Sequence, residues 1–483
     1  MDRLAVARIA REEWRYWSRS KTGIAAIVVV MLLLVTSLFT TYVQVQSERD
    51  ARSQLQTAAE DRFRDQPARH PHRMVHYGHY VFRVPAPLAI ADPGVDPFTG
   101  TVMFLEGHRQ NSATFAPRYS RAQAGPYAAL SPALAYQLLV PLLLIVVGFA
   151  SLSREREART DQLVFTMAVN PSSFWFGKSL ALALLALVAL LPLGLVAIQA
   201  WLNGENGLIV TVFWFGYALY LLCWVFLITA ASAWSRQATT ALLTLLACWV
   251  AISVVLPRVA SSTADTFAPL SSKVQNDLEV SAEMRKIGDG HNANGPAFAK
   301  LRDQLLAQYN VDSIDALPVN YRGIVAGKSE EDLTQILNRF ADRRVDQELA
   351  QAKIASAFSV ASPYLALKSF SISTASTGLD QHHRFLRDAE AARYSFVQGL
   401  NKIHASELSY EDDINRNKSA AAGQRARVEA TNWRVLEDLD WEPVSNAIRL
   451  TKGLPYLAIL LLWTLVAAWF GRTGVSRSWK ASE

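Results

Sequence analysis

Six apolar runs without a charged side chain are the feature that most constrains the fold of this chain. Each is long enough, or nearly so, to cross the roughly 30 Å hydrocarbon core of a bilayer as a helix. In lipid the backbone must satisfy its own hydrogen bonds, which favours helices. The runs are Thr22–Ser47, Pro132–Leu152, Ser179–Ala200, Leu208–Trp234, Thr239–Leu256 and Leu454–Phe470. We therefore predict an all-α polytopic membrane protein with six transmembrane helices.

Two long polar segments separate the spans and are predicted to be large extracytoplasmic insertions. The first begins as a helical continuation of the first span and becomes irregular near Pro67. The second is mainly helical: a capping box at Ser329 and Asp332 predicts a helix to about Phe358, and apolar spacing predicts another over Asp380–Leu408. The predicted boundaries are 1–21 for a cytoplasmic interfacial helix, 22–47 for the first span, 48–130 for the first insertion, 131–152 for the second span, 153–178 for a cytoplasmic loop, 179–257 for spans three to five, 258–452 for the large helical domain, 453–471 for the sixth span and 472–483 for a cytoplasmic tail.

The distribution of basic residues predicts the orientation. Six arginines and lysines precede the first span and three follow the last, whereas the 201–207 turn has none. Because Lys and Arg near span ends mark the cytoplasmic side, both termini are expected in the cytosol. The first run is too long for a signal-peptide core and is expected to remain as an anchor. The net charge of +6 is explained by this bias, so nucleic acid is not an expected partner.

Residues 3–21 have the pattern of an amphipathic helix lying on the membrane. Tryptophans on one face would sit at headgroup depth, and arginines on the other would reach phosphates. The alternative is an ordinary polar end of the first span. The predicted membrane-interface residues are Arg8, Arg11, Trp14, Arg15 and Trp17.

Between the second and third spans lies the charged, amphipathic segment SREREARTDQLVFTMAVNPSSFWFGKSL, residues 153–180. It resembles the first cytoplasmic loop of ABC type-2 transporter permeases, whose pattern is roughly E-R-E-x-G-T-L, about ten residues, a proline and then G-K. Arg159 stands where that family has glycine. The resemblance implies docking on an ATPase, with charges facing outward and Leu163, Phe165 and Met167 inward; the alternative is an ordinary positive-inside loop. The implied coupling residues are Arg154, Glu155, Arg156, Glu157, Thr160, Leu163, Pro171, Gly177 and Lys178.

The nucleotide chemistry is expected on another polypeptide. Gly177-Lys178-Ser179 lacks the glycine of a phosphate-binding loop, since Ser172 stands five residues before Gly177. We therefore expect no catalytic residues and no cofactor in this chain, with ATP and Mg²⁺ on the partner ATPase. The spans hold no ionisable residue in their interiors, which argues against a secondary transporter.

Four histidines, His70, His72, His76 and His79, lie within ten residues and raise the question of a metal site. No cysteine or well-placed carboxylate is adjacent in sequence, so solvated or aromatic-packing histidines are the preferred interpretation and no metal site is predicted. The stretch 289–295 lacks the ligands of a calcium loop and is predicted to be a turn between helices.

Stretches 76–111 and 361–401 resemble a branch of the type-2 permeases with large outer inserts of undefined role. The hypothesis is the permease subunit of an ABC transporter in the bacterial inner membrane, paired with a cytosolic ATPase and a second permease copy or paralogue. One alternative is an ATPase-driven transducer that signals to a periplasmic partner, and another is a membrane scaffold without an ATPase. Substrate-dependent ATP hydrolysis in liposomes separates the first two, and ATPase co-purification excludes the third.

Overall fold

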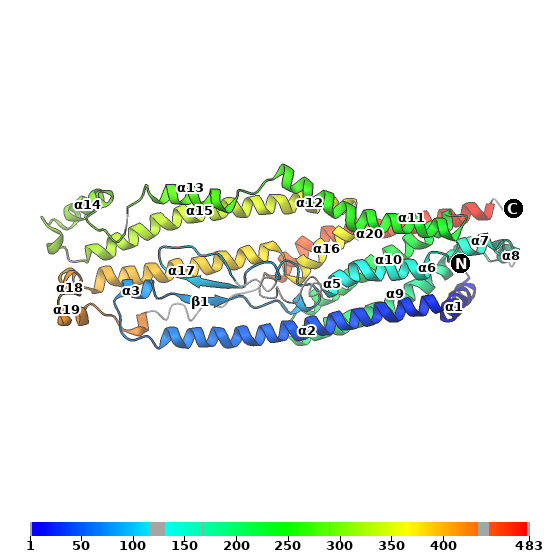
Figure 1. The fold of residues 1–483 in the computed structure, drawn as a ribbon, viewed down its shortest axis with the longest axis horizontal. Coiled ribbons are helices and arrows are strands. Elements are labelled where there is room, and N and C mark those ends of the chain that lie inside the picture. Colours follow the sequence, from blue (N-terminus) through cyan, green and yellow to red (C-terminus); the bar gives the residue numbers. More distant parts are fainter. Residues whose placement is uncertain (1, 115–130, 167–168, 289, 433–443, 481–483) are drawn as a thin grey trace.

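The computed structural model describes residues 2–114, 131–166, 169–288, 290–432 and 444–480. It is elongated: a bundle of apolar helices forms one end, and polar helices continue from it to the other end (Figure 1). We call the polar part the distal domain. The end of the bundle that carries α1, α7, α8 and the end of α20 is the proximal end.

Six helices within the described residues are long and apolar enough to cross a membrane, which confirms the six predicted spans. Their extents are Lys21–Arg64, Pro132–Glu157, Pro171–Leu202, Gly207–Trp234, Ala238–Phe267 and Asn446–Arg477. The elements that build them are α2 (Lys21–Arg64), α5 (Pro132–Leu134), η3 (Ala135–Leu139), α6 (Val140–Gly148), α9 (Pro171–Leu202), α10 (Gly207–Trp234), α11 (Ala238–Val250), η4 (Ala251–Val255), α12 (Leu256–Phe267) and α20 (Asn446–Lys480). Helix α1 (Arg3–Arg19) precedes them.

Proline shapes two of these spans. The π-helical turns η3 and η4 come just before Pro141 and Pro257, where the missing N–H breaks the regular hydrogen-bond ladder. The carbonyl of Gln137, four residues before Pro141, accepts the Tyr220 hydroxyl at 2.7 Å instead. By contrast, α9 runs through Pro192 without a break.

The distal domain packs a small sheet against long helices. Strands β1 (His79–Phe82) and β2 (Val102–Leu105) are antiparallel, with His79 paired to Leu105. Their inner face and the end of α2 pack on α17, where Phe63, Met74, Met103 and Phe396 are buried. The other elements are α3 (Pro71–Val75), η1 (Pro87–Ile90), α13 (Lys273–Met284), η5 (Pro296–Phe298), α14 (Ala299–Tyr309), η6 (Ile314–Ala316), α15 (Tyr321–Ala357), η7 (Phe358–Val360), α16 (Pro363–Ala375), α17 (Leu379–Glu407), α18 (Tyr410–Asn415) and α19 (Ala420–Arg425).

One predicted helix boundary is wrong. α15 begins at Tyr321, where the Asn320 side chain accepts the Arg322 N–H at 3.0 Å. Ser329 is 7% exposed inside the helix, and its hydroxyl donates to the Gly288 carbonyl rather than capping. The predicted second helix is confirmed as α17, Leu379–Glu407. The two strands were not predicted, because each has only four residues.

Helix α16 joins the distal domain to the bundle. Phe370 is fully buried against α10, where a Cβ on Gly216 would lie 2.0 Å from its ring. The Ser371 hydroxyl bonds Tyr217 of α10 at 2.8 Å. Arg449 of α20 donates to the Thr374 carbonyl at 2.9 Å and forms a two-pronged ion pair with Glu205 at 2.7 and 2.9 Å. Helix α16 therefore fills the end of the bundle that faces the distal domain.

Candidate functional site

The charged segment forms two short helices, α7 (Ser153–Glu157), which is the last turn of the second candidate span, and α8 (Asp161–Thr166), which follows it. Figure 1 shows both at the proximal end, beside α1 and far from the distal domain. The segment predicted to couple to an ATPase therefore lies next to the N-terminal helix.

Four charged side chains from α1, α7 and α9 meet here, and we call Glu13, Arg154, Glu155 and Lys178 the charge node. Glu13 Oε1 accepts hydrogen bonds from Arg154 Nη2 at 2.6 Å and from Lys178 Nζ. Lys178 Nζ also donates to Glu155 Oε1 at 2.8 Å. The Glu13 and Lys178 side chains are 3% and 4% exposed. Two acids balance two bases, and this neutrality offsets much of the cost of burying the charges.

Sequence reasoning missed Glu13, although the sequence carried a signal. Glu13 falls on the buried stripe of α1 with Val6, Ala10 and Trp17, at helical spacing. A carboxylate on an apolar stripe needs a buried partner, because an unpaired buried charge is very costly. The partners come from residues more than 140 positions away, so the sequence could indicate the need but not the pairing.

The turn between α7 and α8 is left-handed at Arg159, where φ is +56°. This is the position where the resembling permeases have glycine, the residue that adopts such a conformation at least cost. Thr160 closes the turn: its N–H donates to the Glu155 carbonyl at 2.8 Å, and its hydroxyl donates to Glu155 Oε2 at 2.6 Å. The turn thus joins the charge node to α8.

Two further predicted residues attach α7 to the next proximal loop. Arg156 Nη1 donates to the Ser235 carbonyl at 3.1 Å, at the end of α10. Glu157 Oε2 accepts the Ala238 N–H at 3.2 Å, at the start of α11. A displacement of α7 would therefore reach α10 and α11 as well as α1 and α9.

The predicted sidedness of the segment is wrong at Leu163, Arg154 and Glu155, whereas Glu157, also expected outward, is exposed. Leu163, expected inward, is 62% exposed, whereas the Arg154 and Glu155 side chains, expected outward, are only 23% and 21% exposed. The charge node draws these charges inward. The side chain of Phe165, and Met167 as a whole, lie outside the described residues.

The remaining predicted coupling residues shape the start of α9. Pro171 is the first residue of the helix, after Asn170, whose side chain accepts the Ser173 N–H at 2.8 Å. Gly177 lets α9 approach α1 closely, because a Cβ there would lie 2.7 Å from the side chain of Ile9.

Helix α1 is amphipathic as predicted, but its apolar face packs on the bundle. Trp17 is 3% exposed within the apolar core, and Trp14 packs against its ring at 5.8 Å. This packing differs from the prediction that both rings face lipid headgroups. Arg8, Arg11 and Arg15 are exposed on the opposite face.

The four neighbouring histidines do not form one group. His70 lies with His404 and Asp413, His79 packs on the Phe63 ring at 4.9 Å, and His72 and His76 lie elsewhere. Burial lowers the pKa of His79 to about 4, which keeps its imidazole neutral near pH 7.

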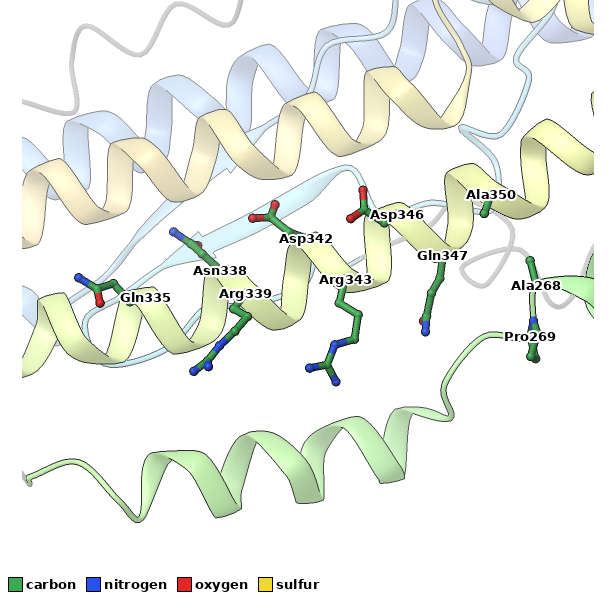
Figure 2. Close-up of a pocket in the computed structure, with 10 residues that line it drawn as sticks. All are labelled: Ala268, Pro269, Gln335, Asn338, Arg339, Asp342, Arg343, Asp346, Gln347 and Ala350. Carbon is green, nitrogen blue, oxygen red and sulfur yellow. The ribbon is translucent and has the colours of Figure 1, made fainter.

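Two hollows lie among the described residues of the distal domain. A groove of 860 Å³ lies along α15. Figure 2 shows two of its lining residues, Arg339 and Arg343, directed toward α13. Arg343 reaches Glu279 of α13 at 3.0 Å. A second cavity of 1120 Å³ lies among α13, α15 and α17, and its walls mix apolar and charged side chains. Either hollow is large enough for a small molecule.

Comparison with protein-family models gives two matches. Residues 108–272 match the ABC-2 family transporter protein, and residues 276–442 match a domain of unknown function, DUF3526. No curated protein matches the chain. The first match covers the second to fifth candidate spans with α7 and α8, and the second covers most of the distal domain. The chain therefore carries the membrane domain of an ABC-2 family transporter followed by a DUF3526 domain of unknown function.

Proposed function

We propose that this chain is the membrane-spanning permease subunit of an ATP-driven transporter of the bacterial inner membrane. A separate cytosolic ATPase would drive it, and a second permease copy or a paralogue would complete the pathway. The ABC-2 family match and the six candidate spans support this proposal. The sequence carries no phosphate-binding loop, in keeping with ATP hydrolysis on a partner.

The proximal end would face the cytosol. Arg8, Arg11 and Arg15 are exposed on α1, and Arg472 and Arg477 lie near the end of α20. Because basic residues accumulate on the cytoplasmic side, this arrangement favours a distal domain in the periplasm. In that orientation α7 and α8 are accessible to a cytosolic ATPase.

The observation that carries the proposal is the charge node. It connects α7 to α1 and α9 through buried ion pairs, while Arg156 and Glu157 attach α7 to the α10–α11 loop. An ATPase that pushes on α7 and α8 would therefore move several spans together. Coupling helices of this kind act by being displaced when the ATPase closes.

The surface available for docking is apolar at Leu163. A partly buried acid such as Glu155 is a poor choice for a docking test, because its substitution would break the charge node itself. We therefore propose Leu163→Glu, with Leu278→Glu as a matched control in the distal helix α13. The two leucines are 62% and 63% exposed, so the same charge enters two equally exposed positions at opposite ends of the molecule.

The measurement is co-purification of the chain with its candidate ATPase from membranes, together with ATP hydrolysis in liposomes. We expect Leu163→Glu to lose the ATPase while inserting normally, and Leu278→Glu to retain it. Equal retention by both variants would refute docking at α8. If even the unmodified chain retains no ATPase, the scaffold alternative is favoured.

A second candidate function is a transducer that passes the ATPase state to a periplasmic partner. The packing of α16 between α10 and α20 favours it, because bundle movements would reach the distal domain directly. Substrate-dependent ATP hydrolysis in liposomes would support transport. Hydrolysis that depends only on a periplasmic protein would support the transducer.

A further inference from the structure

Four histidines from three distant segments meet in the distal domain. His72 and His76 lie one helical turn apart at α3, His108 follows β2, and His291 lies between α13 and η5. One ring nitrogen from each histidine lies within 4.8 Å of the nitrogens of the other three. The ring centroids are 4.9 to 5.7 Å apart. We call this set the histidine cluster.

The spacing within the cluster fits tetrahedral metal ligation. With Zn–N bonds of about 2.0–2.1 Å, two nitrogens of a tetrahedral site lie about 3.3–3.4 Å apart. The Nε2 atoms of His72 and His76 are 3.3 Å apart. The wider separations need a closure of about 1.5 Å at most, which modest rotation of the rings can provide.

His108 is oriented as a ligand by a buried carboxylate. Glu330 Oε2 accepts the His108 backbone N–H at 3.1 Å and lies 3.0 Å from its ring Nδ1. A proton on Nδ1 leaves a lone pair on Nε2, and this buried Nε2 has no hydrogen-bond partner among the described residues. A carboxylate behind a ligating histidine is a common second layer of metal sites.

Glu330 is itself held in place by a buried ion pair with Arg393. Arg393 Nη1 donates to Glu330 Oε1 at 2.6 Å, and the Arg393 side chain is 1% exposed. His108 takes a left-handed backbone conformation with φ of +63°, which is uncommon for a residue other than glycine. The fold thus holds the backbone of His108 in a costly conformation and directs the unpaired Nε2 of its ring toward the other three imidazoles.

The second histidine group, His70 with His404 and Asp413, is built differently. His70 Nε2 pairs with Asp413 Oδ1 at 3.1 Å, while its Nδ1 accepts the His72 backbone N–H at 3.2 Å. Arg416 also contacts the Asp413 carboxylate. Both nitrogens of His70 are used and a cation is already in place, so this group is a structural ion-pair network.

We propose that His72, His76, His108 and His291 bind a divalent transition-metal ion, with Zn²⁺ as the best fit. Four imidazole nitrogens without thiolate suit Zn²⁺, Cu²⁺ or Ni²⁺, and a tetrahedral set favours Zn²⁺ over the tetragonal preference of Cu²⁺. The exposed rings of His76 and His291 give the ion an entry path. This proposal reverses the sequence-based expectation of no metal site, because two of the four ligands lie far from the 70–79 run.

An ion at the cluster would fasten the segment between α13 and α14 to α3 and the β2 loop. Between residues 108 and 291 the chain passes through the bundle. The ion would therefore join two segments that are far apart in the sequence. Metal binding would reduce local opening of the segment around His291.

The test uses the full chain in detergent, purified through a tag without histidine and stripped with a chelator. Zn²⁺ is titrated against a chromophoric competitor in the unmodified protein and in His108→Ala, His291→Ala, Glu330→Gln and the control His382→Ala, a distal histidine outside the cluster. We expect one Zn²⁺ per chain in the unmodified protein and the control. We expect at least tenfold weaker binding in both ligand variants and about 10- to 100-fold weaker binding in Glu330→Gln.

Two further readouts make the result decisive. Co²⁺ should give the strong visible absorption of a tetrahedral site, and Zn²⁺ should slow hydrogen exchange around His291 only where the ligands are intact. Absence of stoichiometric Zn²⁺, or equal affinity in the ligand variants and His382→Ala, would overturn the proposal. Loss of binding in His404→Gln but not in His108→Ala would place the ion in the other group and also overturn it.

Discussion

Replacing Glu13 by Gln should weaken the packing of α1 on the bundle. The substitution keeps the shape of the side chain but changes the net charge of the charge node from zero to +1. Removing one partner of a buried ion pair costs about 3–5 kcal/mol. Lys178 keeps Glu155 at 2.8 Å and Arg154 is 23% exposed, so we expect a smaller loss of about 2–4 kcal/mol.

The assay is amide hydrogen exchange in α1, which reports the free energy of local opening. Since about 1.4 kcal/mol corresponds to a tenfold change, protected amides should exchange roughly 30- to 1000-fold faster. Glu12→Gln is the matched control, because Glu12 is adjacent to Glu13, 65% exposed and paired with the exposed Arg15. Loss of an exposed pair should cost less than about 1 kcal/mol.

A double substitution tests the charge argument itself. Glu13→Gln with Lys178→Met restores a net charge of zero at the node and leaves Arg154 beside Glu155. Replacing both members of a buried pair is far less costly than removing one. We expect much of the protection of α1 to return. The reasoning fails if Glu13→Gln opens α1 no more than Glu12→Gln, or if the double variant is worse than the single one.

Three further predictions concern single positions. Arg159→Gly should stabilise the turn after α7 by up to about 1 kcal/mol, because glycine adopts positive φ without a steric penalty; slower exchange of the Thr160 amide would show this, and an equal effect of Arg159→Ala would contradict it. Gly177→Ala should loosen α1 by about 1–3 kcal/mol through overpacking on Ile9, whereas Gly194→Ala, whose nearest neighbour is 3.4 Å away, should be tolerated; equal exchange of α1 in both variants would refute the close-approach argument. His79→Leu should reduce the acid sensitivity of the distal domain. The pKa of His79 is about 4 in the folded chain and about 6.5 in the unfolded chain, so the unfolded chain binds more protons below pH 6.5. The free energy of unfolding therefore falls as the pH is lowered toward 4, by about 2 kcal/mol at pH 5. Distal-domain hydrogen exchange at pH 7 and pH 5 measures this difference, and an unchanged pH dependence in His79→Leu would rule the reasoning out.

The sequence was sufficient where local patterns decide the structure. The six spans follow from uncharged length, and α17 follows from apolar residues at helical spacing. The start of α15 was missed because Ser329 and Asp332 imitate a capping box, while the actual cap is Asn320. A local motif cannot show whether the helix has already begun.

The charge node and the histidine cluster depend on contacts that no local pattern encodes. Glu13 finds its partners at Arg154 and Lys178, and His72 meets His291, which is 219 positions away in the sequence. Arg154 and Glu155, predicted to face outward, are drawn inward because their partners Glu13 and Lys178 lie on α1 and α9. Such pairings require the packed fold, which is why the sequence indicated a charged, amphipathic segment at residues 153–180 but predicted the wrong side for Leu163, Arg154 and Glu155.

Helix α2 is long enough to connect the proximal end directly to the distal core. It is one unbroken helix of 44 residues, about 66 Å long at 1.5 Å per residue, although about 20 residues suffice to cross a bilayer. One end adjoins α1 at Ser20, and Phe63 near the other end is buried in the distal core. A tilt of about 5° at the proximal end would swing the far tip by about 6 Å. A tilt of α2 that is too small to separate the membrane-spanning helices would thus move its distal end by about the length of a side chain.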